Sequence, residues 1–173
     1  MKKGIVLIFV LTMSLVMLCS CGKNKEDPIT KVALGMSYEE AVKIEPELTE
    51  LAENHSKCSK TCAGAEGILT LSLFGLNGDP EVTSIKWDTR PTDGNGKKVY
   101  DDLFSALKSC YGKPGVSSDK KDIESATGIY DSAQARWEFE DFTVSFSYIE
   151  YHESGMCQVL YHKDIVLDLN KLK

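Results

Sequence analysis

The segment Phe142-Thr143-Val144-Ser145-Phe146-Ser147-Tyr148 alternates apolar and hydroxyl side chains without interruption. Successive side chains of a β-strand point to opposite faces of a sheet, so this pattern predicts a strand with one apolar and one polar face. Strands of parallel sheets are buried on both faces and lack such alternation. The segment therefore favours an antiparallel sheet with one face covered and the other face in water.

Further segments show the same alternation of apolar and polar residues. In the segment Met156–His162, for example, Cys157, Val159 and Tyr161 form the predicted core face. The four segments predicted as strands in this way are Ile68–Phe74, Glu81–Asp88, Arg136–Glu140 and Met156–His162.

Two segments have the features of helices. Lys97–Tyr111 carries an apolar stripe at helical spacing and is followed by Gly112, a residue typical of helix C-terminal caps. Ser37 followed by Glu40 forms a capping box, which predicts that a helix begins at Tyr38. Pro46 can open a second helical piece, so we predict a bent or broken helix from Tyr38 to about Glu53.

The segments His55–Gly67 and Gly115–Gln134 have no regular hydrophobic period and are predicted as loops. The predicted fold class is therefore α+β. Two helices pack on one face of an antiparallel sheet, and the elements follow the order α-β-β-α-β-β-β.

The first 21 residues form a separate unit. Lys2 and Lys3 precede the uncharged apolar run Ile5–Leu18, which has the length of a secretory signal core and is short for a membrane span of about 20 residues. The tetrad Leu18-Cys19-Ser20-Cys21 resembles the lipobox of bacterial lipoprotein signal peptides, with Cys19 in place of the usual Ala or Ser. The resemblance implies that residues 1–20 are removed and that the Cys21 thiol carries a lipid. An uncleaved anchor or an ordinary secretory signal is the alternative.

These features predict a lipid-anchored, extracytoplasmic protein at the cell membrane. Residues 21–30 are the lipidated cysteine and a flexible tether, and residues 31–173 are a single domain. The formal net charge of −6 becomes −8 when residues 1–20, which hold Lys2 and Lys3 and no acidic residue, are removed. An acidic domain is repelled by phosphate groups, which argues against nucleic acid as a partner. The predicted partners are the lipid bilayer, through acylated Cys21, and another envelope protein.

Four cysteines follow Cys21, and an even number in an exported chain favours disulfides. Cys58 and Cys62 are predicted to form a local disulfide within a loop. Cys110 lies on the core stripe of its helix and Cys157 on the core face of its strand, which makes them the second candidate pair. The alternative for this pair is two buried free thiols.

No catalytic, metal-binding or cofactor-binding site is predicted. His55, Cys58 and Cys62 form only one cluster of metal ligands, whereas structural zinc needs about four ligands. Ser105 and Lys108 match a Ser-x-x-Lys pattern, but the Ser-Asp-Asn and Lys-Thr-Gly elements of penicillin-recognising enzymes are absent. Aromatic residues on strands are more often core than groove, and this favours core positions for three of them: Trp87, Trp137 and Tyr148.

The segment Gly35–Val42, Gly-Met-Ser-Tyr-Glu-Glu-Ala-Val, resembles the opening helix of small envelope lipoproteins with a β-lactamase-inhibitor-like fold. The resemblance implies helices against an antiparallel sheet and a role in binding proteins. We therefore predict a non-catalytic binding or interaction module. The alternatives are a small-molecule carrier, or an envelope enzyme whose site is assembled from dispersed residues such as His152, His162, Glu150 and Asp141.

Overall fold

A computed structural model describes residues 26–52, 54–75, 79–89, 94–125, 128–151 and 154–163. These residues form two helices, α1 (Tyr38–Ile44) and α2 (Gly96–Tyr111). They also form eight strands: β1 (Thr49–Ala52), β2 (His55–Cys62), β3 (Ala65–Phe74), β4 (Glu81–Thr89), β5 (Val116–Ser125), β6 (Gly128–Glu138), β7 (Phe142–Tyr151) and β8 (Ser154–Lys163). In chain order, each helix is followed by four strands.

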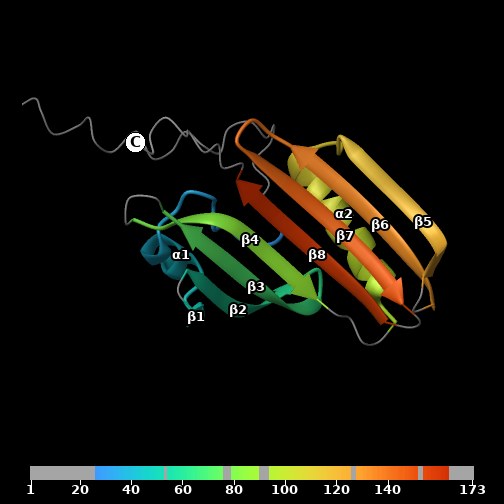
Figure 1. The fold of residues 1–173 in the computed structure, drawn as a ribbon, viewed down its shortest axis with the longest axis horizontal. Coiled ribbons are helices and arrows are strands. Elements are labelled where there is room, and N and C mark those ends of the chain that lie inside the picture. The colour runs from blue at the N-terminus through green and yellow to red at the C-terminus, as the bar shows by residue number, and fades with distance from the viewer. Residues whose placement is uncertain are drawn as a thin grey trace, which may run out of the picture.

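The eight strands belong to one sheet in the order β1-β2-β3-β4-β8-β7-β6-β5, and all pairs are antiparallel. Within each half of the chain, the four strands form a meander in which sequence neighbours pair. The two meanders meet where β4 pairs with β8, a boundary that we term the seam (Figure 1). The chain therefore consists of two α-β-β-β-β units. The first strand of each unit lies at an edge of the sheet, and the last strands of the two units pair at its centre.

One face of the sheet is buried. Leu69 of β3, Trp87 of β4 and Phe146 of β7 point into a single apolar cluster and are at most 1% exposed. Ala41 of α1 and Leu103 of α2 are fully buried in the same cluster, so both helices lie on this covered face. Figure 1 shows α2 running behind β6, β7 and β8.

The predicted α+β class and the predicted order α-β-β-α-β-β-β are wrong. The described residues form a mainly-β fold, and the alternation pattern did not indicate β1, β2 or β5. The helix at Lys97–Tyr111 is confirmed, as is the capping box in which Ser37 and Glu40 bond each other's backbone N–H groups. The inward positions of Cys157, Val159 and Tyr161 are also confirmed.

The predicted bent or broken helix from Tyr38 to about Glu53 is instead one short helix that ends at Ile44. Glu45 adopts a non-helical backbone with φ −121° and ψ 81°, as expected for a residue before proline. Pro46 opens no second helical piece, because the chain turns after it. Thr49–Ala52 then pairs with β2 as the edge strand β1.

The segments predicted as loops contain β2 and β5, whose hydrophobic signal is weak for two different reasons. The inward positions of β2 include Ser56 and Lys60, so polar residues interrupt its apolar face. The edge strand β5 pairs on one side only and is polar at both Ser117 and Ser118, which lie on opposite faces. Neither strand shows the alternation that identified β7.

The packed domain begins before residue 31. Ile29 and Thr30 fall in the segment predicted as a flexible tether, yet they are 1% and 6% exposed. Residues 21–25, including Cys21, lie outside the part of the chain that the structure describes. None of the described helices has the length and apolar character needed to cross a membrane.

The start of α2 rests directly on the sheet through two glycines. Gly96 opens the helix and lies against Gly155 of β8 and the ring of Tyr148. A Cβ atom built on Gly155 would lie 2.9 Å from the Gly96 Cα and 2.9 Å from a ring carbon of Tyr148. The close approach of helix and sheet therefore depends on the absence of a side chain at this position.

We expect Gly155→Ala to lower the free energy of unfolding by about 1–3 kcal/mol, because the added methyl group overpacks this contact. Urea denaturation followed by circular dichroism measures the change. Gly115→Ala is the matched control, since its Cβ would lie 3.9 Å from the Arg136 carbonyl oxygen, an ordinary contact distance. Equal denaturation midpoints for the two variants would contradict the close packing of α2 on β8.

Candidate functional site

The second face of the sheet is not covered by either described helix, and it is turned toward the viewer in Figure 1. Directly paired residues share a face, so the register arranges its side chains in rows that run across the strands. The first row crosses all eight strands: Thr49, Lys57, Thr70, Lys86, Leu160, Ser145, Arg136 and Val116. The second row is Ser59, Ile68, Asp88, Gln158, Ser147, Gln134 and Ser118. The third row is His55, Ser72, Ser84, His162, Thr143 and Glu138.

We term these 21 residues the open face. Nine of them are Ser or Thr, and the charged residues are Lys57, Lys86, Arg136, Asp88 and Glu138. The formal charge of the open face is therefore +1, whereas that of residues 21–173 is −8. The acidic excess of the protein lies outside this face.

The polar groups of the open face bond one another along and across the strands. Lys86 Nζ lies 2.8 Å from Asp88 Oδ2, and Gln158 Nε2 donates a hydrogen bond of 2.6 Å to Asp88 Oδ1. Arg136 Nε lies 3.1 Å from Glu138 Oε1. Ion pairs this exposed to water contribute little to stability, so a binding partner can replace them at small cost.

Apolar side chains are scattered over the same face. Ile68 is 42% exposed and Val116 is 62% exposed, and they lie on strands far apart in the sheet. Eight strands spaced by about 4.8 Å give the face a width of about 34 Å. That width suits a standard protein interface of about 800 Å² per partner, in which hydroxyl and amide groups form hydrogen bonds around isolated apolar contacts.

The described residues of the dispersed catalytic alternative are divided between the two ends of the β7–β8 pair. His162 lies in the third row of the open face, between Ser84 and Thr143. Glu150 pairs with Gly155 at the opposite end of β8 and accepts a hydrogen bond from the Tyr148 hydroxyl. Asp141 precedes β7 at the end where Phe142 pairs with Lys163, which is the end that carries His162 and is remote from Glu150. His152 lies outside the described residues. Among the described residues, no three His, Cys, Asp or Glu side chains form a group that could hold a metal ion.

The aromatic residues considered for a groove lie in the core. Trp87, Trp137 and Tyr148 are 0%, 2% and 1% exposed. Each indole N–H has a backbone acceptor: Trp87 donates to the Lys60 carbonyl at 3.0 Å, and Trp137 donates to the Gly112 carbonyl at 2.9 Å. These side chains therefore hold the covered face together and take no part in the open face.

The four cysteines of the described chain are buried, and neither predicted disulfide forms among them. Cys58 and Cys62 face the core from the same strand, and a separation of four residues along a strand is about 13 Å. Disulfides need Cα atoms within about 7 Å. Cys157 lies 3.8 Å from the Gly96 carbonyl at the start of α2, whereas Cys110 lies near the other end of this helix, about 21 Å away along its axis.

Burial also disfavours the thiolate form of three of these cysteines. It raises the pKa of the Cys62 thiol to about 12 and that of the Cys157 thiol to about 12. The pKa of Cys58 is raised as well, first by burial and then by the nearby Glu45 carboxylate. Since the thiolate is the reactive form, none of these three residues has the environment of a catalytic or redox cysteine.

The sequence predicted only part of the open face. Alternation placed Thr143, Ser145 and Ser147 on an outward face, but it did not show which residues of other strands continue their rows. That continuation depends on the register between strands, and the pattern of one strand carries no information about register.

Comparisons with known proteins give no relative: no family model matches the chain, and no curated protein or solved structure matches it either.

We expect the four cysteines of the soluble fragment Gly22–Lys173 to be reduced and not joined in disulfides. Unfolding in iodoacetamide without a reductant should give four alkylated cysteines in the mass spectrum. The folded fragment should react far more slowly at neutral pH, because burial keeps the thiols protonated. A pair of cysteines that resists alkylation until a reductant is added would contradict the free-thiol state.

Proposed function

We propose that this protein is a lipoprotein, anchored through Cys21 to the extracytoplasmic side of the cell membrane, that acts as a non-catalytic module binding another envelope protein. The basic start, the apolar run Ile5–Leu18 and the lipobox-like tetrad support the anchoring. The open face supports the binding role.

One observation carries the proposal: a continuous row of side chains crosses all eight strands on a face that no described helix covers. The outward residues of such a sheet are expected to be polar, but a face this broad and this close to neutral differs from the acidic remainder of the protein. A protein partner can therefore approach it without the repulsion that the net charge of −8 would produce elsewhere.

The strand edges are less suited to binding than the open face. β1 is four residues long and its register shifts between Glu50 and Ala52. β5 carries Lys120 and Lys121 where its register with β6 shifts. Short edges, bulges and lysines are the features that prevent a further strand from pairing with a sheet, which favours the face over the edges as the contact surface.

We expect Cys21→Ser to abolish lipid attachment, because the lipid is proposed to be joined to the Cys21 sulfur. Metabolic labelling with palmitate and separation of membrane and soluble fractions measure the effect. Cys19→Ser is the matched control and should retain the label, since Ser is a usual lipobox residue at that position. A labelled, membrane-bound Cys21→Ser protein would rule out the proposed anchor.

We expect Ser147→Arg to weaken partner binding several-fold, because a long charged side chain would replace a short hydroxyl in the second row of the open face. The fragment Gly22–Lys173 serves as bait in a detergent extract of the source cell envelope, with cross-linking and quantitative mass spectrometry. Ser105→Arg, on the exposed surface of α2, is the matched control and should retain the same dominant protein as wild type.

Two outcomes would count against the binding module. An empty capture with the wild-type fragment would contradict a stable complex. Equal retention by the Ser147→Arg and Ser105→Arg fragments would show that the partner does not use the open face.

A further inference from the structure

The segment Asp27–Val32, which we term the strap, binds both halves of the domain. Its contacts with the C-terminal half come from the Asp27 carboxylate. This carboxylate accepts hydrogen bonds from the hydroxyls of Tyr111 of α2 and Tyr161 of β8, the latter at 2.9 Å. It also accepts the backbone N–H groups of Ile29 at 2.8 Å and Thr30 at 3.2 Å, which fixes the bend of the strap itself.

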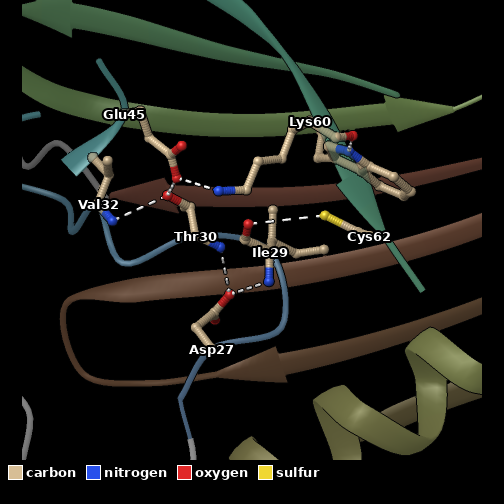
Figure 2. A network of polar contacts seen from close by, with 8 residues as sticks. Asp27, Ile29, Thr30, Val32, Glu45, Lys60 and Cys62 are labelled. Carbon is tan, nitrogen blue, oxygen red and sulfur yellow. Dashed lines mark hydrogen bonds and ion pairs between the residues drawn. The ribbon is translucent and has the colours of Figure 1, made fainter. Parts of the chain in front are cut away.

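The contacts of the strap with the N-terminal half are shown in Figure 2. The Thr30 hydroxyl donates a hydrogen bond of 2.7 Å to Glu45 Oε1, just after α1. Lys60 of β2 holds the same carboxylate oxygen at 2.6 Å, and the Cys62 thiol donates to the Ile29 carbonyl at 3.8 Å. The strap therefore has polar partners in both meanders.

The strap is also part of the core. Ile29 and Val32 are 1% and 5% exposed and belong to the apolar cluster of the covered face. Burial, followed by the charge of Asp27, raises the pKa of Tyr111 and of Tyr161 well above the ordinary tyrosine value. Both hydroxyls are therefore protonated and can donate hydrogen bonds at physiological pH.

The position of the strap limits where a membrane anchor can lie. Asp27 is six positions after Cys21 in the chain, and the Cα atoms of these two residues can lie at most about 22 Å apart when the segment is fully extended. Asp27 is held on the covered face, because its partner Tyr161 points into the core. A lipid on Cys21 therefore keeps the bilayer within a short distance of the covered side. A long flexible tether would instead let the domain tumble.

We infer that the strap sets the orientation of the domain on the membrane, with the covered face toward the bilayer and the open face turned away from it, toward an envelope partner. This inference rests on the lipid anchor of the proposed function. It adds that the folded strap, and not only the length of the tether, decides which surface a partner can reach.

The test uses the mature lipidated protein, residues 21–173, in phosphatidylcholine vesicles, which carry no net charge. One reporter is Lys57→Cys on the open face, and the other is Lys108→Cys on the exposed surface of α2. The four cysteines of the described chain are buried, so we expect them to react slowly. The rate of reaction with a polyethylene-glycol maleimide is compared between vesicles and detergent. We expect an unchanged rate for Lys57→Cys and a several-fold lower rate on vesicles for Lys108→Cys.

A matched control inserts about 20 residues of Gly and Ser between Lys25 and Glu26, which adds roughly 25 Å of average reach and leaves the strap intact. This insertion should return the Lys108→Cys rate on vesicles to its detergent value. Equal protection of the two reporters, protection of Lys57→Cys alone, or protection that survives the insertion would overturn the orientation. Failure of the protein to float with the vesicles would instead overturn the anchor, and the orientation with it.

Discussion

The pairing of β4 with β8 is the interaction on which the rest of the structure depends. It runs from Ser84 opposite His162 to Thr89 opposite Cys157 and joins two four-stranded meanders into one sheet. On the covered side it sets Trp87 beside Val159, which makes the buried cluster continuous across the seam. On the other side it aligns the rows of the open face, which would otherwise be two separate narrow surfaces. Without this pairing, each half would expose a central strand edge and part of its core.

The sequence predicted the elements that have one apolar side and one polar side. It missed strands in which polar residues take inward positions or occupy both faces. The strand at Phe142–Tyr148 and the helix Lys97–Tyr111 have one apolar side, and their periods were visible. In β2, Lys60 faces inward because the buried Glu45 carboxylate pairs with it, a contact between residues that no local pattern connects. The disulfide between Cys58 and Cys62 was predicted from their spacing in a presumed loop, and the extended backbone of β2 makes it impossible. The open face required the register of seven strand pairs, and a single sequence does not give it.

The polar contacts on the covered side fix the position of the strap. An ion pair such as Glu45 with Lys60 loses much of its attraction to the cost of removing both charges from water, so it is weak evidence for stability. Its geometry is specific, however, because the Thr30 hydroxyl must reach the same carboxylate oxygen. Together with the two tyrosines that hold Asp27, it gives the strap one defined path between the helices. Apolar packing alone would allow neighbouring paths of similar energy.

The reduced state of the buried cysteines has a consequence for how this protein matures. Many exported domains reach their native state only after an oxidant or a thiol oxidoreductase has formed their disulfides. Here the fold is held by strand pairing, core packing and the strap, and the described cysteines serve as small apolar residues. Folding of the described domain therefore requires no enzyme that forms disulfides among these four cysteines.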